Sequence, residues 1–412
     1  MKKFTADFET STWEKDRTRV WAWATCEIGN EENLQIGNDI ESFIDFVKNE
    51  KNCVCYFHNL KFDGEFIIYW LLTHNFKHVK DRKEVEDNTF TTLISDMGQF
   101  YSIVIYFKKG NKKTHKVTIY DSLKILPFSV DQIAKSFKLE ISKLSIDYNK
   151  PRKIGHILTD EEREYIKNDV LIVAQALKTL FDDNLKKMTQ GSNALNDYKE
   201  IMGENKIKHF FPELDYDLDK ELRKSYKGGF TYLSPEYKEK EVKNVISLDV
   251  NSLYPSVMYN EELPFGEPIY FEGKYKEDNI YNLYIQTITC SFEIKENKIP
   301  TIQIKNNKSY FRQNEYLRSS NNEIVCLVLT SIDLKLFLEQ YNVFDLEYVC
   351  GWKFKSIKGI FQKYIDKWIK VKNEGTLTRE FRSKNKSKIN VKLIIWKIFN
   401  KSRRTKQNSI FG

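Results

Sequence analysis

The amino-acid sequence predicts a mixed α/β fold with more than one domain. Short runs that alternate apolar and polar side chains, which are typical of strands, are interleaved with longer stretches of helical periodicity. The chain has 412 residues, enough for two to three domains of ordinary size. Hydrophobic residues make up 41% of the chain and aromatic residues 14%, a composition typical of a folded protein and not of a disordered one.

The first elements predict a sheet. Residues 3–9 alternate apolar and polar side chains and residues 20–24 form an apolar run, so we expect the two to pair as strands. Residues 53–57 are a short apolar strand, followed by a loop at 58–64 and the apolar start of a helix at 65–72. A loop between a strand and a helix presents its side chains at the edge of a sheet.

A hairpin and a capped helix complete this first region. Residues 102–106 and 115–120 read as strands that flank a turn at 109–112. The sequence from Thr159 to Glu162 is a capping-box pattern, which predicts a helix that runs into the 170s. We therefore interpret the first 185 residues as one α/β domain.

A second unit is expected after the polar turn at 188–192. Its elements are predicted to be a buried strand at 245–250, a strand at 284–288, and helices at 332–338 and 360–371.

Several classes of protein are disfavoured by composition. No apolar run approaches the roughly 18 to 20 residues that cross a bilayer, and Asp7 lies where a signal peptide would be apolar. The six cysteines include no C-x-x-C pair, and Cys53 and Cys55 alternate on a strand as core residues do. We expect a soluble cytoplasmic protein without a membrane partner, a zinc site or a disulfide framework.

The positive charge is concentrated at the C-terminal end. The chain carries a net charge of +8. Residues 379–412 contain eleven Lys and Arg against one acidic residue, Glu380, for a net charge of +10. Residues 1–378 then hold 55 basic and 57 acidic residues, for a net charge of −2. The body and the tail therefore differ in composition, and such a tail is typical of a segment that binds phosphate.

The acidic residues of the first region suggest a metal site. Asp7 and Glu9 lie on one face of the predicted strand, roughly 6 to 7 Å apart, so they could share metal ions. The alternative is a solvent-facing pair on an edge strand. Asp63 is expected in the strand-to-helix loop, facing a cleft. Tyr165 and Asp169 share one helix face, for which the alternative is a surface Tyr above a solvated Asp.

The order of five motifs resembles a known family. The segments 7–9 (Asp-Phe-Glu), 59–63 (Asn-Leu-Lys-Phe-Asp) and 165–169 (Tyr-Ile-Lys-Asn-Asp) resemble the three exonuclease motifs of proofreading DNA polymerases. The segments 226–229 (Tyr-Lys-Gly-Gly) and 249–255 (Asp-Val-Asn-Ser-Leu-Tyr-Pro) resemble the linker motif and palm motif A of family B DNA polymerases. The amino-acid sequence of the last motif is similar to that of the protein-primed branch found in small phages and linear plasmids.

The resemblance implies a domain plan. It implies a ribonuclease H-like 3′-to-5′ exonuclease domain at 1–185, a linker and the start of the palm at 186–260, an insertion like the first terminal-protein region at 261–358, the palm and fingers start at 359–378, and a basic tail at 379–412. It also implies a phage, prophage or linear-plasmid protein that acts in the cytoplasm of a bacterial host.

The resemblance further implies an exonuclease site. Asp7, Glu9, Asp63 and Asp169 would hold two Mg²⁺ or Mn²⁺ ions, Tyr165 would orient the attacking water, and Lys143 would lie near the scissile phosphate. The residues expected to line a single-strand groove are Thr10, His58, Asn59, Phe62, Ser122, Phe128 and Tyr148. For Phe128, packing in the core is the alternative.

A polymerase site is implied in the second unit, again with two metal ions. Asp249 and the carbonyl of Val250 would bind the metal ions, and Tyr254 would lie under the sugar of the incoming deoxynucleotide as a steric gate. The alternative for Tyr254 is an aromatic lid on a turn. The residues expected near the template phosphates are Tyr226, Gly228 and Gly229. The partners implied are single-stranded DNA, primer-template DNA, deoxynucleotides and a terminal priming protein, and the alternative function is a non-catalytic remnant that binds DNA or the priming protein.

The resemblance is expected to end near Thr378. Family members continue with motif B, a Lys followed by Asn-Ser-x-Tyr-Gly, then a second insertion, motif C with its Asp-x-Asp pair, and a thumb. Residues 388–398 can be encoded by DNA that, read one base later, gives motif B, so we predict an out-of-frame tail from about residue 379. The alternative is a genuine basic arm that binds DNA, although a solvated basic arm would not need the apolar run 393–396. A complete polymerase would need a second carboxylate beside Asp249, for which this tail offers only Glu380, so we expect exonuclease activity without primer extension.

Overall fold

The computed structural model describes residues 1–14, 18–50, 52–109, 112–250, 252–303 and 316–377. The chain divides into two compact units. Within the described residues, the first unit comprises Met1–Asn196 and the end of a helix from Trp368, and the second comprises Asp197–Lys367. None of the helices in these described ranges has the length and apolar character needed to cross a membrane. The predicted basic tail at 379–412 lies outside the described residues.

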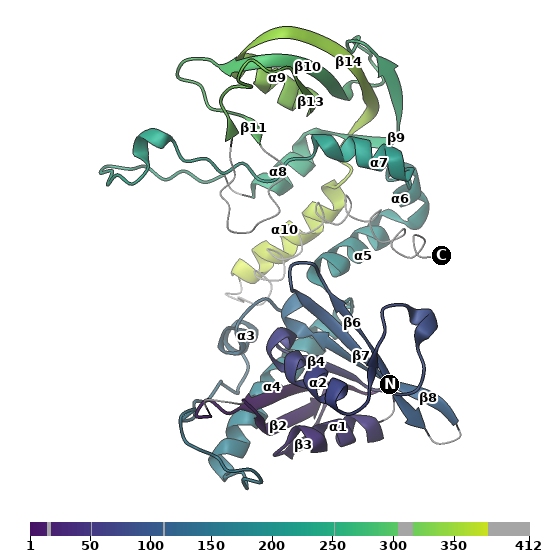
Figure 1. Ribbon diagram of the computed structural model, residues 1–412, viewed down its shortest axis with the longest axis vertical. Coiled ribbons are helices and arrows are strands. Elements are labelled where there is room, and N and C mark those ends of the chain that lie inside the picture. Colours follow the sequence, from purple (N-terminus) through teal and green to yellow (C-terminus); the bar gives the residue numbers. More distant parts are fainter. Residues whose placement is uncertain (15–17, 51, 110–111, 251, 304–315, 378–412) are drawn as a thin grey trace. The chain divides into compact units, whose positions relative to one another are not determined.

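An eight-stranded sheet forms the first unit (Figure 1). The strand order is β3-β2-β1-β4-β8-β7-β6-β5, with β1 parallel to β4, β4 parallel to β8 and β5 parallel to β6, and the other pairs antiparallel. The strands are β1 (Lys3–Thr10), β2 (Val20–Glu27), β3 (Asn30–Gly37), β4 (Val54–Phe57), β5 (Lys77–His78), β6 (Thr89–Ile94), β7 (Phe100–Lys109) and β8 (Lys112–Asp121).

The strand pairs predicted from the sequence are confirmed. In the antiparallel β1–β2 pair, Asp7 lies opposite Ala24 and Glu9 opposite Ala22. In the β7–β8 hairpin, Ser102 lies opposite Tyr120; two of the predicted turn residues, 110 and 111, lie outside the described part of the chain. Because β1 lies between β2 and β4 in the sheet, the alternative of an edge strand for Asp7 and Glu9 is wrong.

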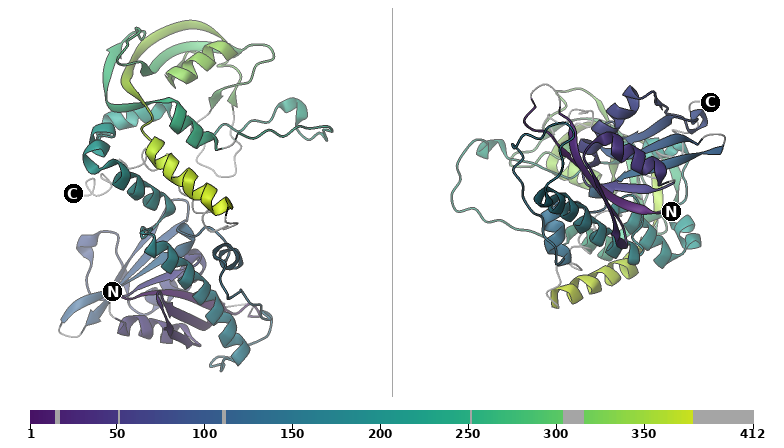
Figure 2. Two further views of the ribbon diagram at one scale, coloured as in Figure 1. Left: turned by 180° about the vertical axis from the view of Figure 1, so that it is seen from behind. Right: turned by 90° about the horizontal axis from the view of Figure 1, so that it is seen from below.

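Helices cover both faces of this sheet (Figure 2). One apolar core joins α1 and α2 to Phe4, Ala6 and Phe8 of β1, while α3 and α4 pack against residues such as Trp21 and Val54 on the opposite face. The helices in this part of the chain are α1 (Ile40–Asn49), α2 (Leu60–Thr73), α3 (Val130–Phe137), α4 (Asp160–Asp182) and α5 (Gln190–Met202), which continues past the end of the first unit, with short 3₁₀ turns at Arg82–Glu84 and Ser122–Lys124. Since side chains alternate along a strand, the even positions of β1 enter the first core and the odd positions face α4.

The start of α2 differs from the prediction. The sequence predicts a loop at 58–64, but the helix begins at Leu60 and places Asp63 in its first turn. Asn59 adopts a left-handed backbone with φ of 77°, and the Asp121 carboxylate accepts the backbone N–H groups of Asn59 and Leu60. These bonds satisfy donors that a helix start leaves unpaired, so the helix forms directly after the strand.

The second unit contains a four-stranded antiparallel sheet in the order β13-β10-β14-β9. Its core includes Phe292, Phe337 and Tyr341. The strands are β9 (Glu262–Glu272), β10 (Leu283–Ile294), β11 (Ile302–Gln303), β12 (Tyr316–Leu317), β13 (Val325–Thr330) and β14 (Tyr341–Lys358). The helices of this part of the chain are α6 (Glu204–Phe210), α7 (Tyr216–Leu222), α8 (Leu253–Asn260), α9 (Ser331–Gln340) and α10 (Gln362–Leu377), with 3₁₀ turns at Arg223–Ser225 and Pro235–Tyr237. The strand expected at 284–288 and the helices expected at 332–338 and 360–371 are therefore confirmed.

The buried strand expected at 245–250 is absent. These residues have no strand structure, and Ile246 and Leu248 are 82% and 90% exposed. A strand needs a neighbour that pairs with its N–H and C=O groups and covers its side chains. None of the described strands pairs with this run, so its apolar pattern alone does not make it a strand.

Candidate active site

Three carboxylates from two elements meet on the α4 face of the sheet. Asp7 and Glu9 come from odd positions of β1, and Asp169 comes from α4. One oxygen from each of the three lies within 4.8 Å of the others. Glu9 and Asp169 are buried and Asp7 is partly buried. In the described part of the chain this is the one group of three or more acidic, His or Cys side chains close enough to hold a metal ion.

Asp63 lies next to this group but outside it. Its side chain is buried in the first turn of α2, and the negative charge of Asp7 acts on it. Its Oδ1 atom, like Oδ1 of Asp169, is buried without a hydrogen-bond partner among the described residues. Buried polar atoms are normally paired, so the two oxygens have unused capacity to bind a cation.

The pKa values reflect crowding of buried acids. Burial and the Asp169 carboxylate raise the pKa of Asp7 to about 7. Burial, followed by the charge of Asp7, raises the pKa of Glu9 and of Asp63 well above their usual range. Burial also raises the pKa of Asp169, although Lys143 opposes that rise. Hard divalent cations such as Mg²⁺ prefer carboxylate oxygens and favour the ionised form, so this donor set fits such ions.

Lys143 is the cation nearest to the carboxylates. Its Nζ atom lies 2.5 Å from Oδ2 of Asp169 and 5.4 Å from the centre of the Tyr165 ring. Burial alone would lower the pKa of Lys143, but the Asp169 carboxylate outweighs burial and the pKa is raised. Lys143 is therefore charged, and it offsets part of the negative charge of the cluster.

Two tyrosines lie beside the same cluster. The hydroxyl oxygens of Tyr148 and Tyr165 are 2.5 Å apart. Tyr165 is buried on α4, and burial together with the charge of Glu9 raises its pKa. The alternative of a surface tyrosine above a solvated aspartate is therefore wrong for Tyr165 and Asp169.

The residues predicted to line a groove differ in exposure. Phe62 and Tyr148 are 48% and 44% exposed and Asn59 is exposed, whereas Thr10 and His58 are half-buried. Phe128 is also half-buried and packs against the core formed by α3 and α4, as its alternative predicted.

Ser122, another residue predicted to line the groove, lies beneath the surface of the structure. Ser122 is fully buried, and its Oγ atom lies 3.0 Å from Nδ1 of His58 and donates to the Phe57 carbonyl. Nε2 of His58 donates to the Phe128 carbonyl, and burial lowers the pKa of His58. Ser122 therefore lies behind the His58 ring and helps to orient it.

Sequence reasoning missed Asp121. Its buried carboxylate accepts the backbone N–H groups of Asn59, Leu60 and Leu123. It thus joins the end of β8 to the start of α2, the helix that carries Asp63. A signal was available, because Asp121 directly follows the strand predicted at 115–120, and side chains just after a strand lie at the edge of a sheet.

The residues predicted for a polymerase site lie on exposed parts of the second unit. Asp249, Val250 and Tyr254 are exposed, and Asn251 between them lies outside the described ranges. Tyr226 is also exposed. Added Cβ atoms at Gly228 and Gly229 would meet nothing within 4 Å, so packing does not require glycine there.

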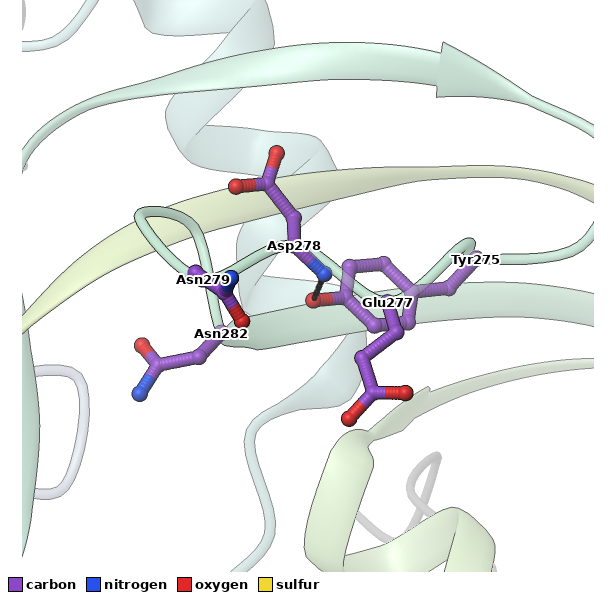
Figure 3. Close-up of a pocket in the computed structure, with 5 residues that line it drawn as sticks. All are labelled: Tyr275, Glu277, Asp278, Asn279 and Asn282. Atoms are coloured by element: carbon purple, nitrogen blue, oxygen red, sulfur yellow. Dashed lines mark hydrogen bonds between the residues drawn. The ribbon is translucent and has the colours of Figure 1, made fainter.

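A small polar pocket of the second unit lies in the β9–β10 connection (Figure 3). The Asp278 backbone N–H donates to the Tyr275 hydroxyl, and Nζ of Lys353 lies 2.6 Å from Oδ2 of Asp278. The hydrogen bond from Lys353 lowers the pKa of Asp278 to about 2. The polar groups of Asp278 thus stabilise the loop itself. The residues that line the pocket are Tyr275, Glu277, Asp278, Asn279 and Asn282.

Two relatives with a similar sequence are phage DNA polymerases. The DNA polymerase of Bacillus phage M2 is 50% identical over 372 residues, which cover 90% of this chain and 64% of the relative. The DNA polymerase of Bacillus phage phi29 is 48% identical over 379 residues, which cover 91% of this chain and 65% of the relative. The chain thus spans about two thirds of the length of these relatives.

Solved structures of phi29 DNA polymerase share the fold. An orthorhombic crystal form has a TM-score of 0.90 at 44% identity, covering 96% of this chain and 68% of that chain. A complex with single-stranded DNA has a TM-score of 0.86 at 44% identity, covering 96% and 67%. The family model described as DNA polymerase type B, organellar and viral, matches residues 45–391, which extends past Thr378, where the resemblance was expected to end. The chain therefore belongs to the type B DNA polymerase family of organelles and viruses.

Proposed function

We propose that the first unit is a metal-dependent 3′-to-5′ exonuclease within a protein-primed DNA polymerase. The observation that carries the proposal is the meeting of Asp7, Glu9 and Asp169 oxygens within 4.8 Å, with Asp63 buried beside them. These four carboxylates would hold two Mg²⁺ or Mn²⁺ ions, which when bound activate the attacking water and stabilise charge on the leaving 3′ oxygen.

The other residues of the site have separate roles. Lys143 carries the positive charge next to the carboxylates, so it offsets the charge of an incoming phosphate. The Tyr165 hydroxyl, held by Tyr148, orients the attacking water. The exposed rings of Phe62 and Tyr148 stack on bases of a single strand, which is worth about 1 to 3 kcal/mol per base and requires no particular base.

The partners follow from the family and remain part of the proposal. The phi29 relative has been solved with single-stranded DNA and with primer-template DNA and incoming nucleotides, and we assign the same classes of ligand to this chain. The second unit, with its sheet at 262–358, would bind a terminal priming protein. The place of action would be the cytoplasm of a phage host.

Nucleotidyl transfer is not expected of this 412-residue chain. A polymerase site holds two metal ions between carboxylates of two motifs. Asp249 is exposed, and it lies outside the one acidic group that could hold a metal in the described residues. Template-dependent incorporation of deoxynucleotides that is lost in Asp249→Ala would contradict this expectation.

A nuclease assay tests the main proposal. The purified chain is incubated with labelled single-stranded DNA and Mg²⁺ or Mn²⁺, beside the double variant Asp7→Ala with Glu9→Ala. We expect mononucleotides from the wild-type chain alone. Equal rates for the two proteins would overturn the proposal, and salt-sensitive DNA binding without release of nucleotides would favour a non-catalytic remnant.

A further inference from the structure

A long irregular segment carries two residues of the candidate site. Residues 139–159, here called the strap, connect α3 to α4 and contain no helix or strand. From the strap, Lys143 reaches Asp169 and Tyr148 reaches Tyr165. The backbone hydrogen bonds described within the strap belong to two short turns, from Lys150 to Asp147 and from His156 to Lys153. The positions of Lys143 and Tyr148 therefore depend on side chains that hold the strap.

Arg152 is the most buried charged residue of the strap. It is 2% exposed, and its Nη1 atom donates to the carbonyls of Asp147 at 3.0 Å and Lys150 at 2.9 Å. Its guanidinium lies over the Trp21 ring, 4.1 Å from the ring centre. These bonds fold the strap around the guanidinium directly beside Tyr148.

Glu162 joins Arg152 to α4. Its Oε1 atom accepts from Nε of Arg152 at 2.8 Å, and its Oε2 atom accepts from Nε2 of His156 at 2.7 Å and from the Thr159 backbone N–H at 3.1 Å. Burial would raise the pKa of Glu162, but hydrogen bonds from His156 and Arg152 outweigh it and lower the pKa to about 2. Glu162 is therefore ionised, one turn before Tyr165 on the same helix.

Further tethers act on either side of this pair. The Thr12 hydroxyl donates to the Tyr148 carbonyl at 2.6 Å, and the Asn168 side chain donates to the Ser142 carbonyl at 3.2 Å. Both groups are exposed, whereas the Arg152–Glu162 pair is buried. A buried pair with its hydrogen bonds satisfied is costly to break, because breaking it leaves an unpaired buried charge.

We propose that Arg152 and Glu162 are positioning residues of the exonuclease: their buried ion pair holds the strap so that Lys143 and Tyr148 reach Asp169 and Tyr165. Neither residue belongs to the carboxylate cluster, so both act through the strap. The inference rests on the proposed nuclease function and adds two residues that the motifs do not contain.

The first experiment weakens the pair without removing the helix cap. In Glu162→Gln, the new amide can still serve the capping box with Thr159, since Gln is accepted at that position, but the charge that holds Arg152 is gone. We expect the single-turnover rate on single-stranded DNA to fall about 10²-fold, the loss typical of a misplaced catalytic group. Asp182→Asn, which breaks an exposed ion pair with Lys178 on the same helix, is the matched control and should keep the wild-type rate.

A double-mutant cycle separates positioning from general destabilisation. In a background of Lys143→Ala with Tyr148→Ala, Glu162→Gln should change the remaining rate less than twofold, because the groups that it positions are already gone. A full loss in that background would show that Glu162 acts in another way and would overturn the inference. Wild-type rates for Glu162→Gln alone would also overturn it.

A second variant and a protease readout complete the test. Arg152→Lys keeps the charge, but a lysine does not reproduce the planar fork that binds Glu162 and two carbonyls together; we expect the same loss of rate with a cooperative melting transition. Trypsin should cut Glu162→Gln faster than wild type after Lys143 and Lys153, and unchanged cutting would overturn the inference. A wild-type chain without nuclease activity would instead overturn the proposed function, and with it this inference.

Discussion

Lys143, on a segment without regular structure, forms an ion pair with Asp169 of helix α4, with Nζ 2.5 Å from Oδ2. The pair brings one positive charge to a cluster of buried acids. The Lys143 charge lowers the pKa values of Asp7, Glu9 and Asp169, although burial raises each of them more strongly. Lys143 therefore influences the pH at which the cluster becomes ionised, which is the form that the proposed metal ions require.

Replacing Lys143 should shift the pH dependence of nuclease activity. Without the positive charge, the carboxylate pKa values rise further, so a higher pH is needed to ionise the metal ligands. We expect the acid limb of the rate profile of Lys143→Met to move to higher pH, together with a lower maximal rate. Nuclease rates measured from pH 5 to 9 at a fixed Mn²⁺ concentration test this. Lys135→Met is the control, because it removes a lysine from an exposed ion pair with Asp131. An unchanged acid limb would contradict the assignment.

Asp7→Asn should stabilise the metal-free protein at alkaline pH. Because the folded-state pKa of Asp7 is raised to about 7, the folded state favours the protonated acid. Stability from this group is complete below the unfolded pKa of about 4 and is lost as the pH rises through about 7. Between pH 5 and pH 8, the melting temperature of the wild-type chain should therefore fall more than that of Asp7→Asn. The two decreases should differ by several degrees, because 1 kcal/mol of stability corresponds to roughly 2 to 4 °C in a protein of this size.

The same melting experiment tests metal binding. Addition of Mg²⁺ or Mn²⁺ at pH 8 should raise the melting temperature of the wild-type chain, because the ions bind the ionised carboxylates of the folded state. The increase should be much smaller in Asp7→Asn. Equal increases in the two proteins would place the bound ions elsewhere.

Phe62→Ala should weaken binding of single-stranded DNA. Loss of one stacked base costs about 1 to 3 kcal/mol, equivalent to an affinity loss of about 5- to 150-fold. Fluorescence anisotropy at constant salt measures the affinity for single-stranded DNA, with Asp7→Ala present in every variant so that the DNA is not degraded. Leu72→Ala is the matched control, since Leu72 is a similarly exposed apolar residue on the same helix. Equal affinities for the two variants would exclude stacking on Phe62.

Asp121→Ala should destabilise the first unit. The change leaves three backbone N–H groups without their acceptor, and a buried unpaired donor costs about 1 to 3 kcal/mol. Asp121→Asn keeps a carbonyl oxygen in the place of Oδ1 and should cost less. Urea unfolding of both variants measures the loss in free energy of unfolding. A larger loss for Asp121→Asn than for Asp121→Ala would contradict this role of Asp121.

Local patterns predicted much of the first unit. The alternation in residues 3–9 predicts strand β1 and puts Asp7 and Glu9 on one face, because the side-chain period of a strand is two. The Thr159 capping box predicts the start of α4, and both of its hydrogen bonds are present. Helical spacing then puts Tyr165 and Asp169 together. Motif order added Asp63 and Lys143, for which local periodicity has no signal.

Predictions failed where the outcome depends on distant partners. The apolar run 245–250 has the pattern of a buried strand, yet no described strand pairs with it. Helix α2 begins at Leu60, only three residues after β4 ends at Phe57, because Asp121, some sixty residues away in the sequence, accepts the backbone N–H groups of Asn59 and Leu60. Likewise, the local sequence has no signal for the burial of Ser122 behind His58. The out-of-frame origin of residues 379–412 stays a prediction.

The sequence by itself determined which residues share a strand or helix face, since these periods are set by backbone geometry within a few residues. It also determined the family, through the order of its motifs. Only the tertiary structure decided that the faces of β1 and α4 meet, that β1 is an inner strand, and that Arg152 is buried against Glu162. Those outcomes depend on pairing and burial between segments far apart in the chain. The free energy of one such contact depends on the neighbouring contacts that exclude water from it.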